Sequence, residues 1–400
     1  MRRSDGSVGW NVSIALLYPI ICIACVALFA YRSTNSARFD GTSNLKVQLN
    51  DNWDLNGGFR AGTGHYANVW ARDAFFALFG ASDRLVRYQQ FVNRLRNDMT
   101  VEHQVPFTYN RVYYVRSVFF PWLPDSWKKR RTTLVEYDDE KLHRTVMDAN
   151  AQFVIMCCYA NDRRMVREAL EWYTQFVVGG LVEEEAFGSW EDTLMLGGAV
   201  PYTNVLVLRA QELARKHFGL EIQIVERQKV FELTLDRDKP GGLDAVSVSM
   251  MSMWWKRAPG AKEALLALST SFGWHEDEAP LEMIKNRQRR LPNSWVFLPV
   301  RLIGQGEYHR EWRWSWVGCL FCWALAKQGF VDRAQRHFAP YQKAREKYNT
   351  IHEVYDGRGA PINIALYRSE KCFSEGLGMY LRAHKEISDK KKQLKRYDII

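Results

Sequence analysis

The residues from Tyr66 to Asp73 combine aromatic rings with a fixed cation and a fixed anion where a helix is expected to begin. Tyr66 and Trp70 offer ring faces, and Arg72 and Asp73 offer a guanidinium and a carboxylate. The apolar C–H faces of a sugar ring stack on aromatic side chains, while its hydroxyls bond to charged donors and acceptors. The segment therefore fits a sugar subsite. It also fits a plain helix start with Asp73 near the positive end of the helix dipole.

Four further segments place carboxylates beside aromatic or amide side chains. They are 144–150 with Asp148 and Asn150, 188–193 with Trp190, Glu191 and Asp192, 308–316 with His309, Trp312 and Trp314, and 352–357 with Glu353. Each has an ordinary explanation as a helix cap, a surface charge or a turn. Five such segments, each expected where a loop meets a helix, favour one shared cleft.

Two separated carboxyls are what hydrolysis of a glycosidic bond requires. One protonates the leaving oxygen, and the other activates a water or attacks the anomeric carbon. A carboxyl beside the indole of Trp190 would suit the acid, because apolar surroundings raise the pKa of a carboxyl. Glu191 and Asp192 both follow that indole, so the acid can be either of them.

The elements that must position these residues are mostly helical. Hydrophobic periodicity, with Asp or Ser at several starts and Gly at several ends, predicts helices over a series of ranges. These are 73–80, 83–97, 148–160, 162–178, 203–217, 262–271, 315–328, 331–348 and 374–384. The best strand candidate is 221–235. Closely spaced helix pairs and long intervening loops predict an all-α toroid of helical hairpins, with the unusual residues on the long loops.

The order of the segments resembles the (α/α)6-barrel, or six-hairpin, glycosidases. This group contains fungal glucoamylase, the glucosidase domain of glycogen-debranching enzyme and processing α-glucosidases. The similarity covers about residues 58–383 and implies an (α/α)6 toroid. Glucoamylase-like members bind a terminal glucose with a Tyr-x-x-x-Trp-x-Arg-Asp segment. The resemblance therefore implies stacking by Tyr66 and Trp70, and hydroxyl binding by Arg72 and Asp73.

The resemblance also implies two catalytic carboxyls. Debranching-type members carry Trp-x-Asp with the Asp as general acid, which matches Asp192, whereas glucoamylases place the acid directly after the Trp, which would select Glu191. The sequence at 202–206 resembles the debranching type and favours Asp192. The family base is a Glu that precedes a short turn and a Trp-Ser helix start. Glu353 holds that place, and Glu370 is the alternative.

Other family elements assign the rest of the cleft. An Asp-Ala-Asn element and an aromatic, His-containing element correspond to 148–150 and 308–316. The resemblance thus implies substrate binding by Asp148, Asn150, Trp190, Glu191, His309, Trp312 and Trp314. Phe373 replaces the family's usual Trp, and the chain is shorter than most members, so the identity of the glycan stays open.

The N-terminal region predicts a membrane anchor. Residues 12–31 carry no charge and are long enough to span a bilayer as a helix, although a cleaved signal peptide is an alternative. The flanking arginines leave the orientation open, with the catalytic part expected on the lumenal or extracellular side. The expected organisation is a tail over 1–11, a transmembrane helix over 12–31, a linker over 32–52, the catalytic domain over 53–386 and a basic tail over 387–400.

Charge and cysteines point to no other partner. The net charge is +10, but the basic clusters are spread over loops and the C-terminus, and no nucleic-acid module accompanies them. Cys319 and Cys322 have CxxC spacing within one apolar helix, which favours buried thiols over a redox or metal site. The chemistry implied above needs neither a metal nor an organic cofactor.

These observations together predict an inverting exo-α-glycosidase, with α-glucosidase as the first choice. Asp192 would protonate the glycosidic oxygen and Glu353 would activate water, with their carboxyls roughly 6.5–9.5 Å apart. One alternative is a membrane-tethered sugar-binding protein without turnover. Another is a different helical-toroid enzyme, such as a terpene cyclase or a prenyltransferase-like protein, to which Asp138 and Asp139 alone point.

Overall fold

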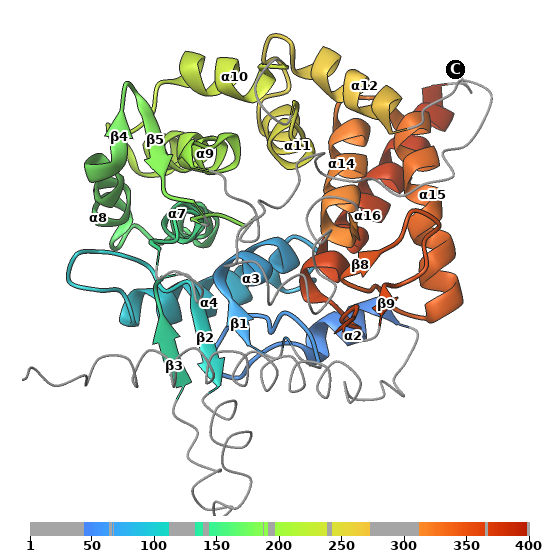
Figure 1. The fold of residues 1–400 in the computed structure, drawn as a ribbon, viewed down its shortest axis with the longest axis horizontal. Coiled ribbons are helices and arrows are strands. Elements are labelled where there is room, and N and C mark those ends of the chain that lie inside the picture. Colours follow the sequence, from blue (N-terminus) through green and yellow to red (C-terminus); the bar gives the residue numbers. More distant parts are fainter. Residues whose placement is uncertain are drawn as a thin grey trace, which may run out of the picture.

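The computed structural model describes residues 44–63, 66, 68–111, 133–138, 144–186, 188–190, 197–237, 242–272, 312–364 and 367–397. Over these ranges the chain is mostly helical, with short strands between helices (Figure 1). The predicted anchor at 12–31 lies outside them, as do Glu191, Asp192 and His309. Within the described ranges, no helix combines the length and the apolar character that crossing a membrane requires.

Six helices of the described chain form an inner ring (Figure 1). They are α3 (Ala71–Leu78), α7 (Asp148–Ala160), α9 (Pro201–Phe218), α11 (Ala245–Trp254), α14 (Ser315–Lys327) and α16 (Ser374–Tyr397). Each packs against the next in chain order, and α16 packs against α3, so the ring closes. Helices α7, α11 and α14 are buried along nearly their whole length, as expected of helices enclosed on all sides.

A second set of helices covers the ring from outside. These are α2 (Leu45–Asp51), α4 (Arg84–Asn97), α8 (Val166–Glu171), α10 (Arg227–Leu235), α12 (Ala261–Ser271) and α15 (Val331–Tyr348). Each precedes an inner helix in the sequence and packs on the ring, for example α4 on α7 and α15 on α14. Helix α4 buries one apolar stripe, with Phe91, Val92 and Leu95, and exposes its opposite face.

Short antiparallel strands join the helices. They are β1 (Val69–Trp70), β2 (Thr108–Arg111), β3 (Thr133–Glu136), β4 (Val177–Val178), β5 (Leu181–Glu184), β6 (Gly198–Ala199), β7 (Arg313–Trp314), β8 (Val354–Tyr355), β9 (Asn363–Ile364) and β10 (Tyr367–Arg368). They form the sheets β1-β2-β3, β4-β5-β6, β7-β8 and β9-β10. In the β7-β8 pair Trp314 lies opposite Val354, which brings the start of α14 beside the loop that carries Glu353.

The first turns of several inner helices meet at one end of the ring. Tyr202 near the start of α9 donates a hydrogen bond to Asp148, the first residue of α7. A Cβ added to Gly376, near the start of α16, would lie 2.2 Å from Oγ of Ser315, the first residue of α14. The charge of Arg72, near the start of α3, acts on both Asp148 and Glu375. The positive ends of these helix dipoles therefore gather around one interior region.

Most of the predicted helices are confirmed, with several differences. The range 162–178 holds only α8 and a 3-10 turn at Trp172–Phe176, followed by β4. Helix α2 lies in the range predicted as a linker and packs on α16, and α16 itself continues to Tyr397, into the predicted basic tail. Helix α11 was not predicted. The five described cysteines are buried and free, as expected for Cys319 and Cys322 in their apolar helix.

The strand predicted over 221–235 is wrong, because residues 227–235 form α10. The alternation of polar and apolar residues at 221–225 lies in a loop, and alternation alone builds no strand where no partner strand pairs with it. Val230, Phe231 and Thr234 supply the helical stripe that α10 buries, and α10 packs on α9.

Candidate active site

The segment that carries Trp70, Arg72 and Asp73 is fixed by β1 and the start of α3. Trp70 is the last residue of β1, and its ring packs edge-on against Phe107 with centroids 5.0 Å apart. Arg72 and Asp73 follow in the first turn of α3, where Nη2 of Arg72 lies 3.9 Å from Oδ2 of Asp73. Asp73 is buried, and Tyr66 is half-buried beside the same loop.

Asp148 is fully buried at the first position of α7. Its Oδ2 accepts hydrogen bonds from the hydroxyl of Tyr202 at 3.2 Å and from Nε2 of Gln152 at 3.3 Å. Its Oδ1 has no hydrogen-bond partner. Burial raises the pKa of Asp148 above its ordinary value, although the charge of Arg72 and the bond from Tyr202 act in the opposite direction. The carboxyl therefore keeps a free oxygen inside the ring.

Arg72 is the cation that these carboxyls surround. Burial alone lowers the pKa of its guanidinium, but the charges of Asp73, Asp148 and Glu375 raise it, and the result lies above the ordinary value. The group is therefore always charged. Its Nη1 is buried and has no hydrogen-bond partner.

Glu375 belongs to the same cluster, although its sequence context does not distinguish it from an ordinary glutamate in a first helical turn. It is the second residue of α16 and is 1% exposed. Burial raises its pKa well above the ordinary value, and the charges of Asp73, Asp148 and Glu353 add to that effect, while Arg72 opposes it. A Ser-Glu pair is common at helix starts, so only the burial of the first turn of α16 reveals this residue.

Two backbone hydrogen bonds fix Glu353, which directly precedes β8. Its backbone N–H donates to the carbonyl of Glu370 at 2.9 Å, and its carbonyl accepts from the N–H of Ser315 at 3.0 Å. The hydroxyl of Tyr367 donates to Oε2 of Glu353 at 2.5 Å. The ring of Tyr367 in turn stacks on Trp312, with centroids 5.0 Å apart and planes 28° from parallel. The side chain of Glu353 is 1% exposed.

Glu370, the alternative base, lies beside Glu353. Its backbone N–H is 3.4 Å from Oε2 of Glu353. A Cβ added to Gly62 would lie 2.3 Å from Cγ of Glu370, so this side chain is covered by the glycine of the loop that leads to Tyr66. The structure thus brings both candidate bases to the same end of the ring as Asp73, Asp148 and Glu375.

An aromatic cluster lies next to the carboxyls. Trp190 packs edge-on against Trp314, with centroids 5.8 Å apart, and against Trp316, with centroids 4.9 Å apart. Trp314 also contacts Phe373, the residue that replaces the family's Trp. Trp190 is buried at the point where the chain continues to Glu191 and Asp192, so the acid's role stays a prediction for residues outside the described ranges.

Asn150 makes its hydrogen bonds to the backbone of two neighbouring segments. Its Oδ1 accepts from the N–H of Val105 at 2.8 Å, and its Nδ2 donates to the carbonyls of His103 and Ala169 at 2.8 and 3.1 Å. These bonds fix the 103–105 loop on α7. They give Asn150 a structural role, while its contact with substrate stays a prediction.

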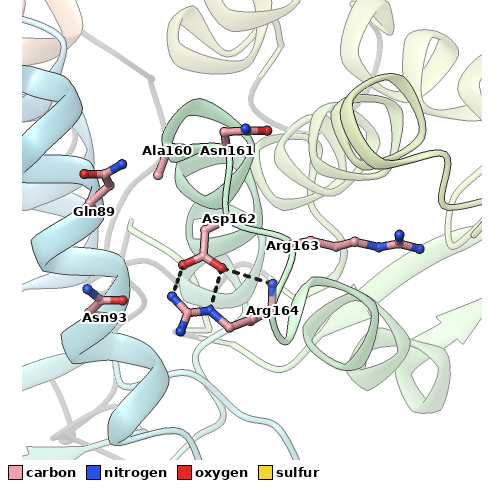
Figure 2. Close-up of a pocket in the computed structure, with 7 residues that line it drawn as sticks. All are labelled: Gln89, Asn93, Ala160, Asn161, Asp162, Arg163 and Arg164. Atoms are coloured by element: carbon pink, nitrogen blue, oxygen red, sulfur yellow. Dashed lines mark hydrogen bonds and ion pairs between the residues drawn. The ribbon is translucent and has the colours of Figure 1, made fainter.

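One pocket of the described chain lies outside the ring and does not contain this cluster. It has a volume of about 390 Å³ and lies between α4 and the connection from α7 to α8 (Figure 2). Its carboxylate, Asp162, is already paired with Arg164 at 2.8 Å and with Arg96. Because it offers neither paired carboxyls nor aromatic faces, we assign the chemistry to the buried cluster. No group of described His, Cys, Asp and Glu residues is arranged to hold a metal ion.

No protein-family model and no curated protein matches this chain. Solved glycosidases share its fold. A wild-type glycosidase aligns over 91% of this chain and 98% of its own, at 13% identity and a TM-score of 0.54. A glycosidase variant in complex with glucose aligns over the same shares at 11% identity and a TM-score of 0.55. The GH63 mannosylglycerate hydrolase from Thermus thermophilus, in complex with Tris, aligns over 86% of this chain and 99% of its own at 14% identity and a TM-score of 0.55.

Proposed function

We propose that this protein is a glycoside hydrolase built on an (α/α)6 toroid, and specifically an inverting exo-acting α-glucosidase. The observation that carries the proposal is the cluster of buried carboxyls where the inner helices begin. Asp73, Asp148, Glu353, Glu370 and Glu375 are each less than 5% exposed there. Buried carboxyls destabilise a fold unless they are paired, so those that a protein keeps often serve in binding or catalysis. The shared fold with glycosidases supports the same reading.

In this mechanism Glu353 is the general base. The bond from Tyr367 fixes its Oε2, and Oε1 is the atom to which we assign the proton of the water. Burial, together with the charge of Glu353, raises the pKa of Tyr367, so its phenol stays a hydrogen-bond donor at neutral pH. Loss of the water's proton to Glu353 would generate the nucleophile that attacks the anomeric carbon from the face opposite the leaving group.

Asp192 is the proposed general acid, with Glu191 as the alternative. Both residues follow Trp190, whose buried indole would disfavour a charged carboxylate and so keep the acid protonated. The proton of the acid would pass to the glycosidic oxygen as the bond breaks. A separation of roughly 6.5–9.5 Å between the acid and Glu353 would leave room for the water of an inverting reaction.

The remaining roles belong to binding. We propose that Tyr66 and Trp70 stack on the terminal sugar, and that Arg72 and Asp73 bind its hydroxyls. A glucose-containing oligo- or polysaccharide is the proposed substrate. The glucose complex of one similar glycosidase supports a glucose-type subsite.

The test is release of glucose from a panel of α-linked glucose oligosaccharides, and of mannose from mannosylglycerate, with the anomeric form of each product followed by NMR. We expect β-glucose from the wild type, and a loss of about 10²–10⁴-fold in turnover for Asp192→Asn and Glu353→Gln. Glu370→Gln tests the alternative base. Glu184→Gln is the matched control. Glu184, the last residue of β5, is also buried, but its carboxylate accepts a hydrogen bond from the hydroxyl of Thr203.

Three other results of this test would change the proposal. Release of α-glucose would show retention and exclude the inverting mechanism. Loss of turnover in Glu370→Gln but not in Glu353→Gln would transfer the base to Glu370. Sugar binding without release from any substrate would establish the alternative, a carbohydrate-binding protein that has lost turnover.

We also propose that residues 12–31 anchor the protein in a membrane, with the ring on the lumenal or extracellular side. The proposal rests on the uncharged run alone. The full chain should resist extraction from membranes by alkaline carbonate, and release into the supernatant would exclude an anchor.

A further inference from the structure

The buried polar atoms without a hydrogen-bond partner at the helix-start end of the ring include Nε1 of Trp70, Nη1 of Arg72, Oδ1 of Asp148 and Oε1 of Glu375. Buried polar groups in native proteins are nearly always paired, so a group of unpaired ones at one place indicates a missing partner. Trp70 and Arg72 contribute donors and Asp148 and Glu375 contribute carboxyl oxygens, which is a complementary set for hydroxyls, since each hydroxyl both donates and accepts.

The faces of α16 show where Glu375 points. Gly376 faces α14, since a Cβ there would touch Ser315, and Gly378 faces α3, since a Cβ there would lie 2.5 Å from Ala77. Tyr380 and His384 pack on Phe338 of the outer helix α15. At about 100° per residue, Glu375 lies between the two glycine directions and opposite the face that meets α15. Its side chain therefore points into the ring.

The charges around Glu375 define what it can bind. Asp73, Asp148 and Glu353 act on it as like charges, and Arg72 is the opposing cation. A ligand that brought another negative charge among these buried carboxyls would be repelled, because like charges repel strongly where water is excluded. An uncharged polyol ring would meet no such penalty.

We infer that Glu375 is a further binding residue of the sugar subsite, and that with Arg72 and Asp148 it selects an uncharged sugar over an anionic one such as a uronic acid. This inference rests on the proposed function, because it places the terminal sugar in the same cluster. Burial and the neighbouring carboxyls raise the pKa of Glu375 well above the ordinary value, which favours the protonated form. In that form the carboxyl can donate a hydrogen bond to a sugar oxygen and accept one from a sugar hydroxyl.

The experiment measures binding, independently of turnover. Titration calorimetry at pH 7 compares glucose with glucuronate for the wild-type full chain, Glu375→Ala and Glu375→Gln. We expect glucose to bind the wild type at least about tenfold more tightly than glucuronate, and Glu375→Ala to bind glucose about tenfold more weakly. Glu375→Gln should keep most of the affinity, because an amide also offers one donor and one acceptor. Glu386→Gln is the control, since Glu386 lies on the same helix but already pairs with Lys327 and Arg382.

The outcomes separate this inference from the proposed hydrolysis. Glucose bound by the wild type, lost in Glu375→Ala, and never released from any glycoside would support the subsite and refute the hydrolase. Unchanged glucose affinity in a folded Glu375→Ala protein that still hydrolyses substrate would refute the role of Glu375 and leave the hydrolase intact. Equal binding of glucuronate and glucose, or no binding of glucose by the wild type, would also overturn the inference. Melting temperatures of all variants show whether a loss comes from unfolding.

Discussion

The buried carboxyls of the site repel one another where water is excluded, and three effects reduce this repulsion. Arg72 supplies a cation among Asp73, Asp148 and Glu375. The starts of the surrounding helices add the partial positive charge of their exposed N–H groups. Burial raises the pKa of Asp148 and of Glu375, which reduces the number of carboxyls that are ionised together.

Glu375 should make the stability of the protein depend on pH. In an unfolded chain its pKa is near the ordinary 4.5, and in the folded ring it is well above that value. Between these two values the folded state holds more protons than the unfolded state, so the free energy of unfolding falls as pH rises. The slope is at most about 1.4 kcal/mol per pH unit for one group.

Glu375→Gln removes this ionisation and tests it. The variant should unfold like the wild type near pH 4 and be the more stable of the two at pH 7, with a difference that grows between these values. Urea unfolding at a series of pH values measures it. A constant difference across the series would mean that the pKa of Glu375 is the same in the folded and the unfolded chain. Glu386→Gln removes the ion pairs to Lys327 and Arg382 and should not gain stability at pH 7.

At the scale of single elements, glycines set how closely the helices of the ring approach. A Cβ on Gly378 of α16 would lie 2.5 Å from Cα and O of Ala77 in α3, and a Cβ on Gly80 would lie 2.4 Å from the carbonyl oxygen of Gly378. These contacts are with backbone, which cannot rotate away as a side chain can. The close approach of α3 and α16 is also what brings Arg72 and Asp73 beside Glu375.

Gly378→Ala should therefore destabilise the protein by about 3 kcal/mol or prevent folding, because the added methyl forces two helices apart. It should also weaken sugar binding in whatever protein folds, since the cluster spans the same two helices. Gly197→Ala is the control, because a Cβ there meets its nearest neighbour at 3.4 Å, an ordinary contact. Denaturant unfolding of both variants measures the effect, and equal midpoints would show that α3 and α16 can separate without cost.

The elements also show what sequence patterns can and cannot predict. Helix α7 was predictable because Asp148 starts it and Asn161, in the left-handed conformation, ends it. Helix α11 was not, because Ala245–Trp254 alternates serines with apolar residues and is buried on every side, so it has no amphipathic stripe of helical period. At 221–235 the pattern predicted a strand that does not form, because the strand-like alternation lies just before the helix α10.

The candidate site was predictable in part for a similar reason. Trp70, Arg72, Asp73 and Glu353 stood out because aromatic residues beside fixed charges are rare by chance, and the structure brings their segments to one end of the ring. Glu375 did not stand out, since an exposed glutamate in a first helical turn has the same sequence signature as a buried one. The distinction is made by α3 and α14, which cover that turn and come from distant parts of the chain.

At the scale of the whole molecule, the inner helices α3 and α16, which lie far apart in the sequence, close one ring. Helix α16 packs against α3 and against α2, so residues near 50 and near 375 share one contact region (Figure 1). Nε2 of Gln48 donates to the carbonyl of Asn349 at 2.7 Å, and Nδ2 of Asn52 donates to the carbonyl of Cys372 at 2.6 Å. The folded unit therefore includes residues that a boundary at 53 would leave outside.

A chain that begins at Trp53 should consequently be much less stable than one that begins at Asn44. It lacks the buried side chains of Leu45 and Leu49 and the hydrogen bonds of Gln48 and Asn52, which together contribute about 5 kcal/mol. The chain from Asn44 should unfold at the same denaturant concentration as the full chain. Since Asn52 also donates to Oγ of Ser374 at 2.8 Å, directly before Glu375, the shorter chain should lose sugar affinity along with stability. Equal unfolding midpoints for the two chains would mean that α2 is only a linker and that the ring closes through α3 and α16 alone.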